Sequence, residues 1–141
     1  MSDGNLGLLL LTLLYSDGKI EGRKRFQKIV CILKHQSGIP FNYEFIPYFY
    51  GPYAEDLANS LNTLVSSGLV EERKSLVSEM FSQYVYELTN QGTELATNLS
   101  KKIENINSKL FHQFSQEVSS LKYIDTPELV KHSKKVSKMY D

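Results

Sequence analysis

Six basic side chains in two clusters could hold the phosphate groups of a nucleic acid. Four lie close together on a predicted helix and two lie in a predicted β-hairpin: Arg23, Lys24, Arg25, Lys28, Arg73 and Lys74. Lys and Arg neutralise phosphates and release the counterions condensed on DNA. No Asp or Glu occurs from Gly22 through Tyr43, so the first cluster is locally positive. Basic residues on a helix are also often plain solvated surface, and the sequence leaves both interpretations open.

Polar side chains suited to reading base edges occupy the helix predicted over residues 53–67. Its expected exposed face carries Asn59, Ser60, Asn62, Thr63 and Ser66. Asn can bond the edge of adenine in the major groove, so Asn59 and Asn62, with Thr63, are the candidate base contacts. The helix begins with Glu55 and Asp56 and carries no Lys or Arg, so an ordinary solvated helix face explains it equally well.

An aromatic segment separates the two predicted helices. Between Phe41 and Tyr53 it holds seven aromatic residues, and its early part alternates aromatic with polar residues, which is typical of a short strand or an extended arm. We expect most of these rings to cover the core between the helices. An exposed remainder would form an interaction surface, for which the candidates are Tyr48, Tyr50 and Tyr53.

Nothing in the sequence indicates catalysis. The three histidines, His35, His112 and His132, lie far apart without metal-ligand spacing. There is no phosphate-binding loop, dinucleotide fingerprint or nucleophile elbow. The single cysteine, Cys31, lies in an apolar run that suits a buried thiol. We therefore expect no enzyme activity, no catalytic residue, no metal and no cofactor.

Composition favours one ordinary globular chain. It has 141 residues, 41% of them hydrophobic, and its 16 basic residues balance its 16 acidic ones. A general nucleic-acid binder is usually more basic, so any phosphate-binding surface must come from uneven placement of charge. The apolar run over residues 6–15 has no basic residues before it and is too short to span a bilayer. We expect it to be a buried helix in a cytoplasmic protein that does not bind membranes.

The elements follow from the hydrophobic periodicity. Helices are predicted over residues 6–15, 22–35 and 53–67, strands over 69–77 and 83–88, and one long helix from residue 89 through 114 or beyond. A short basic helix begins near Asp125. The long helix has a continuous apolar stripe, which could form a dimer interface or pack on the first helix. We therefore expect a domain over residues 1–100 and a C-terminal helical extension over residues 101–141.

Two motifs resemble known families. The segments SSGLVEE and YELTNQGTELA resemble the end of winged-helix domains of the PadR and MarR type, in which Leu88, Thr89 and Gly92 fill the turn from the wing into the next helix. FQKIVCIL and YEFIPYFYGPYAEDL are similar to the prokaryotic winged-helix proteins related to YwgA, and more distantly to the Panacea or SocA-like antitoxin domain. The residues that carry this second resemblance are Phe26, Gln27, Lys28, Tyr50, Gly51 and Pro52.

These resemblances imply a mainly α protein with a small β-hairpin, a winged helix-turn-helix followed by a C-terminal helical extension. The favoured function is a homodimeric transcriptional regulator that binds double-stranded DNA. The alternative is a protein-interaction module, antitoxin-like or adaptor, which keeps the shape without binding DNA. DNA binding requires the basic residues to meet on one face beside an exposed third helix. A protein-interaction role requires that face to be neutral or acidic, with exposed aromatic residues.

Overall fold

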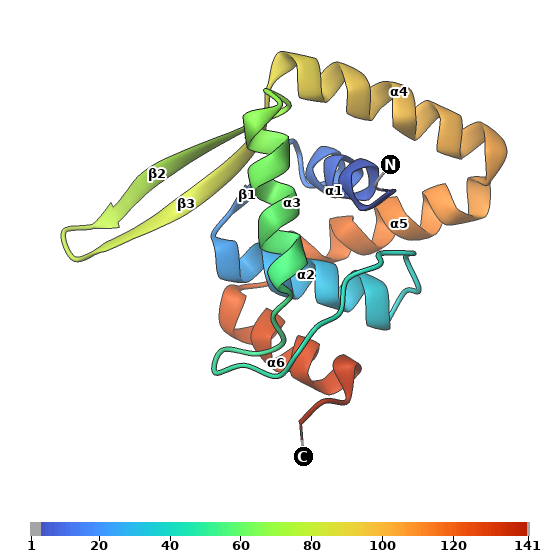
Figure 1. Cartoon of the computed structure of the whole chain (residues 1–141). Coiled ribbons are helices and arrows are strands. Elements are labelled where there is room, and N and C mark those ends of the chain that lie inside the picture. Colours follow the sequence, from blue (N-terminus) through green and yellow to red (C-terminus); the bar gives the residue numbers. More distant parts are fainter. Residues whose placement is uncertain (1–3, 141) are drawn as a thin grey trace.

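The structure is a computed structural model that describes residues 4–140. Within this range the chain forms six helices and three strands (Figure 1). The helices are α1 (Gly4–Tyr15), α2 (Arg23–His35), α3 (Glu55–Ser66), α4 (Asn90–Ile106), α5 (Ser108–Leu121) and α6 (Thr126–Ser137). The strands are β1 (Lys19–Glu21), β2 (Val70–Ser78) and β3 (Phe81–Leu88). The protein is therefore mainly helical with a small antiparallel sheet, as the sequence predicts.

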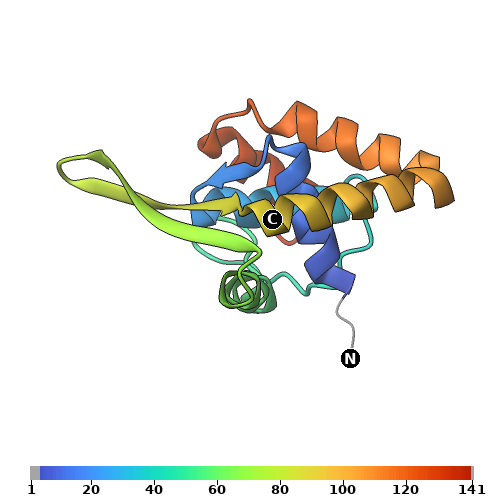
Figure 2. The ribbon, with the colours of Figure 1, turned by 90° about the horizontal axis from the view of Figure 1, so that it is seen from above.

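The three strands form one sheet in the order β1-β3-β2. Central Tyr86 of β3 lies opposite Ile20 of β1 on one side and Glu72 of β2 on the other. The sequence does not predict β1, because three residues are too few to show a strand period. The β2–β3 hairpin extends away from the helices in two perpendicular views (Figure 1, Figure 2).

Helix α1 is the centre of the hydrophobic core. Leu9, Leu10, Leu11 and Leu13 are all buried, so the helix is covered on several sides, as its apolar sequence predicts. α4 and α5 pack against α1, which lies between them in Figure 1. The core continues into the last third of the chain, because buried residues of α5 and α6 belong to the same cluster as α1.

The expected single long helix after residue 89 is wrong. The chain turns at Asn107, which ends α4, begins α5 and has φ −146° and ψ 79°. The Asn107 side chain accepts a hydrogen bond from the Leu110 amide at 3.1 Å, which caps α5. The turn lets α5 run back along α1, where the ring of Phe114 meets Tyr15 edge-on at 5.3 Å. Much of the apolar stripe thus packs within the chain.

The aromatic segment is extended, and its early rings fill the core as expected. Phe41, Tyr43 and Phe45 are buried, and they alternate with exposed residues. The segment pairs with itself only through an isolated antiparallel bridge between Ile46 and Tyr53 within the described part of the chain. Tyr48, Phe49 and Tyr50, which follow Pro47, are exposed, and Tyr53 is half-buried.

The turn between β3 and α4 explains the Leu-Thr-x-x-Gly motif. The Thr89 hydroxyl accepts a hydrogen bond from the Gly92 amide at 3.0 Å and donates one to the Gly68 carbonyl at 2.7 Å, so Thr89 caps α4 as predicted. A Cβ atom on Gly92 would lie 1.9 Å from the Leu69 carbonyl oxygen. The motif therefore holds the start of the hairpin against the start of α4.

We expect Gly92→Ala to destabilise the protein by about 2–3 kcal/mol, because the methyl group must push backbone away from backbone. Urea unfolding followed by circular dichroism measures this free energy. The matched control is Gly4→Ala, since a Cβ atom there meets nothing within 4 Å. Equal stability of the two variants would contradict the account of the turn.

Candidate binding cleft

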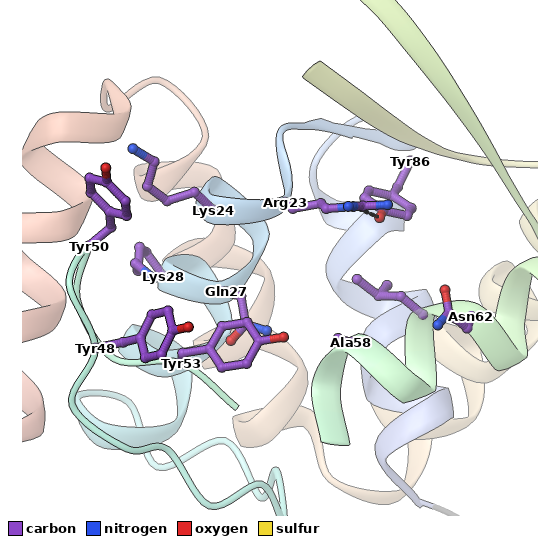
Figure 3. Close-up of a pocket in the computed structure, with 11 residues that line it drawn as sticks. Arg23, Lys24, Gln27, Lys28, Tyr48, Tyr50, Tyr53, Ala58, Asn62 and Tyr86 are labelled. Carbon is purple, nitrogen blue, oxygen red and sulfur yellow. Dashed lines mark hydrogen bonds between the residues drawn. The ribbon is translucent and has the colours of Figure 1, made fainter. Parts of the chain in front are cut away.

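A cleft of about 370 Å³ lies between the start of α2, the loop that precedes α3, and the sides of α3 and β3 (Figure 3). Its lining residues are Arg23, Lys24, Gln27, Lys28, Tyr48, Tyr50, Tyr53, Ala58, Leu61, Asn62 and Tyr86. None of these eleven residues is acidic. The cleft therefore joins members of all three candidate sets: three of the basic residues, one of the base-contact residues and all three tyrosines.

Two neighbouring side chains of α2 hold the loop that leads into α3. The Gln27 amide group donates to the carbonyl of Ala54 and accepts from its N–H, both at 2.9 Å. The Lys28 ammonium donates to the Pro52 carbonyl at 2.9 Å. We call these three hydrogen bonds the latch. Because Ala54 immediately precedes α3 and is buried, the latch satisfies backbone groups that have no water to bond.

The latch also needs a glycine. Gly51 has φ +100°, a conformation that side-chain-bearing residues rarely adopt. A Cβ atom there would lie 3.0 Å from Cε of Lys28 and 3.4 Å from the side chains of Val130 and Ser133 on α6. The Gln-Lys and Gly-Pro pairs that carry the second resemblance therefore lie next to each other in the fold, and their residues position α3.

Arg23 forms one end of the cleft. Its guanidinium lies 3.6 Å from the centre of the Tyr84 ring, and its Nε donates to the Tyr86 hydroxyl at 3.1 Å. Burial and the neighbouring Glu72 carboxylate raise the pKa of Tyr86 to about 12, so this hydroxyl is neutral at physiological pH. Arg23 also lies 3.8 Å from Glu72, which partly offsets its charge.

The loop tyrosines form the other end. The Lys24 ammonium lies 4.5 Å from the centre of the Tyr50 ring, and the rings of Tyr48 and Tyr53 are 5.4 Å apart. Tyr140 bonds the backbone N–H and carbonyl of Tyr48 through its hydroxyl, at 2.8 and 3.0 Å. Tyr140, at the C-terminal end of the described chain, thus holds the backbone of Tyr48 in place.

Two expected phosphate contacts need correction, because their charges are engaged inside the protein. Lys28 is 3% exposed and bonds Pro52. Arg25 donates to the carbonyls of Leu121, Lys122 and Ile124, where it caps the C-terminal end of α5. Residues 25 and 28 share one face of α2. That face packs toward α6, so neither cation points toward an external duplex.

The hairpin pair lies apart from the cleft. Arg73 forms ion pairs with Glu87 at 3.1 Å and with Glu71 at 3.9 Å, so two carboxylates compensate its charge. Lys74 is exposed. Neither residue is among those that line the cleft.

The candidate base contacts occupy the outer face of α3. Asn59, Asn62 and Thr63 are exposed, but only Asn62 lines the cleft. The Thr63 hydroxyl donates to the Asn59 carbonyl one turn earlier, at 3.1 Å. The expectation that Ser60 is exposed is wrong, since Ser60 lies on the buried side with Leu57, Leu61 and Leu64.

Sequence reasoning missed several cleft residues. Gln27 and Leu61 belong to motifs or stripes that the sequence identifies, but their role depends on where the loop packs. Tyr86 lines the cleft and shares one face of β3 with Tyr84, which the alternation along the strand predicts. Only the pairing of β1 with β3 brings that face to the start of α2, because β1 leads directly into α2.

Other kinds of site find no support in residues 4–140. No three His, Cys, Asp or Glu side chains of this range are grouped so that they could hold a metal ion. None of its helices combines the length and apolar character that crossing a bilayer requires. Cys31 is buried as expected, and burial raises the pKa of its thiol to about 12, which keeps it neutral and unreactive at physiological pH.

The chain is thus a small, mainly helical protein with a three-stranded sheet and a cationic, tyrosine-rich cleft. It belongs to the family of the uncharacterized protein YwgA of Bacillus subtilis (strain 168), to which it is 31% identical over 134 residues. The match covers 90% of this chain and 79% of the relative. No family model matches the chain.

Burial makes the stability of this protein depend on the charge of Lys28. Desolvation, with Lys24 and Lys134 nearby, lowers the pKa of Lys28 from 10.5 to about 8. Below that value Lys28 is protonated in both the folded and the unfolded chain. Between the two values the unfolded chain keeps a proton that the folded chain has released, so the free energy of unfolding rises with pH.

We expect the stability of the wild type relative to Lys28→Met to rise from about pH 7 to about pH 9. Met fills a similar volume without a charge, and the comparison cancels the opposing contribution of Cys31. Urea unfolding of both proteins at each pH measures the difference. A difference that stays flat over this range would show that Lys28 is not buried as a cation.

Proposed function

We propose that this protein is a protein-interaction module on a winged-helix scaffold, and that its hairpin tip contacts the partner. The order α1-β1-α2-α3-β2-β3, with the sheet order β1-β3-β2, supports a winged-helix arrangement with α3 beside the hairpin. On this scaffold, the outer face of α3, the hairpin and the start of α2 are the surfaces that would meet a partner. The chemistry of those surfaces favours protein over nucleic acid.

The observation that carries the proposal is the apolar hairpin tip, which we define as Leu76, Val77, Met80 and Phe81. These four side chains are 56–95% exposed. Their residues lie at the end of β2, in the turn and at the start of β3, and the hairpin that carries them extends away from the helices (Figure 1). Exposed clusters of large apolar residues mark interaction sites in soluble proteins. A hairpin tip that binds the DNA backbone needs cations in place of these apolar side chains.

The charges on α2, α3 and the hairpin also favour a protein partner. Among the six basic residues that the sequence indicates, Lys28 and Arg25 are engaged internally, and Arg73 and Arg23 have carboxylates beside them. The first turn of α3 adds Glu55 and Asp56. Of the six, this leaves Lys24 and Lys74 exposed without an ion pair in residues 4–140, so few cations are available to hold the phosphates of a duplex.

The partner must offer an apolar segment flanked by acidic groups. A second concavity, of about 670 Å³, connects Phe81 at the hairpin tip with Tyr50 and Lys24 at the cleft. An apolar segment laid along it would cover Phe81 and Tyr50. Carboxylates at its cleft end would then pair with Lys24.

The test compares the wild type with a hairpin-tip variant, Leu76→Thr/Met80→Ser/Phe81→Thr. We expect affinity capture to retain a partner that the tip variant loses, and the purified partner to bind the variant at least about tenfold more weakly. The matched control is Ile106→Ser, which removes another large exposed apolar side chain, 83% exposed, at the far end of α4. Unchanged binding to the tip variant would contradict the proposal, as would use of the tip by a second copy of this chain.

A homodimeric DNA-binding regulator is the second candidate, and the outer face of α3 favours it. Asn59, Asn62 and Thr63 are exposed there, uncharged and suited to base edges. Fluorescence polarisation with pooled duplex DNA across a salt series tests this role with the same proteins. Binding that weakens steeply with salt and survives in the tip variant would favour DNA over a protein partner.

A further inference from the structure

The strongest unexplained feature of the molecule is the charge of Lys28. It is buried, and its ammonium group, which carries three donors, donates a hydrogen bond to one backbone carbonyl, that of Pro52. Across residues 4–140, no carboxylate lies within ion-pair distance of it. Its charged neighbours Lys24 and Lys134 have the same sign. Burying a cation in this way is unfavourable unless an anion joins it.

The cleft beside Lys28 is open to such an anion. Arg23 and Lys24 stand at its rim, and the lining includes no carboxylate. In Figure 3 Lys24 and Lys28 lie beside Tyr48 and Tyr50, whereas Arg23 and Tyr86 lie on the other side, toward Asn62 of α3. A small anion that enters from solvent beside the loop tyrosines would meet Lys24 and Lys28 without repulsion from an acidic side chain in the lining.

The rest of the lining suits a flat ring. Tyr48 and Tyr53 form a pair of tilted rings, and Leu61 with Ala58 supplies an apolar wall. The volume of about 370 Å³ falls within the range of pockets that hold small organic ligands. Stacking on tyrosine and contact with Leu61 would bind an aromatic ring, and the cations would orient its charged group.

We infer that this cleft is a binding site for a small aromatic anion, a one- or two-ring molecule that bears a carboxylate or a phosphate near Lys28. Aryl carboxylates and nucleoside monophosphates share this chemistry. The site shares Lys24 and Tyr50 with the concavity proposed for the partner, but the hairpin tip can be altered without changing any residue that lines the cleft.

Isothermal titration calorimetry on the full chain tests the site with indole-3-acetate and AMP. Adenosine is the control that lacks the charged group, and inorganic phosphate is the control that lacks the aromatic ring. We expect at least one aromatic anion to bind with a dissociation constant below about 1 mM. Each control should bind at least about tenfold more weakly than that anion. Comparison of indole-3-acetate with AMP identifies whether an aryl carboxylate or a nucleoside monophosphate binds more tightly.

Variants then assign the binding to the cleft. Lys28→Met should weaken binding at least about tenfold, and Lys24→Gln at the rim should weaken it less. Lys131→Met is the charge-matched control, because Lys131 is exposed on α6 and does not line the cleft. Should Lys28→Met fail to fold, the rim variant carries the test alone.

Three results would overturn the inference. The first is no binding of either aromatic anion at about 1 mM, and the second is binding of inorganic phosphate as tight as that of the aromatic anion. The third is wild-type affinity in the folded Lys28→Met variant, or in Lys24→Gln where Lys28→Met fails to fold. None of them bears on capture of a partner by the hairpin tip, so this site and the proposed function can fail separately.

Discussion

The amide of Gln27 forms two hydrogen bonds with the backbone of Ala54, and the position of α3 depends on them. A helix-turn-helix usually joins its helices by a short turn, but here an extended aromatic segment intervenes. α3 has its main element contacts with β2 and α1, whereas α2 packs chiefly on α6. The latch therefore fixes the start of α3 relative to α2, with Lys28 and Gly51 completing the arrangement.

The cleft follows from this geometry. The latch holds the loop against α2 at the start of α3, and the cleft lies between these elements. Tyrosines of the loop, cations of α2 and Tyr86 of the sheet meet there. The same arrangement buries Lys28, since its stem passes beneath the loop to reach Pro52. The latch thus produces both the cleft and the buried charge of Lys28, which has no ion-pair partner in residues 4–140.

The sequence predicts the elements that are determined by local residue patterns, but it does not predict the features that depend on packing between distant segments. The apolar run of α1, the β2–β3 hairpin and the Thr89 cap all follow from periodicity or turn chemistry. The break at Asn107 does not, because the apolar stripe continues on both sides and the chain turns there to cover α1. For the candidate site, the sequence identifies Lys28 as a member of a basic cluster and Gln27 as part of a motif. Their contacts depend on a segment more than 20 residues away in the chain, so periodicity could not reveal them.

The most direct test of the latch is hydrogen–deuterium exchange in the wild type and in Gln27→Leu. The Ala54 amide should be protected from exchange in the wild type, because it donates a hydrogen bond to Gln27. The side chain of Ala54 itself forms no cap on α3. In Gln27→Leu, exchange at Ala54 and through α3 should accelerate, while α1 and α4 retain their protection. Equal protection of α3 in both proteins would contradict the claim that Gln27 sets its position.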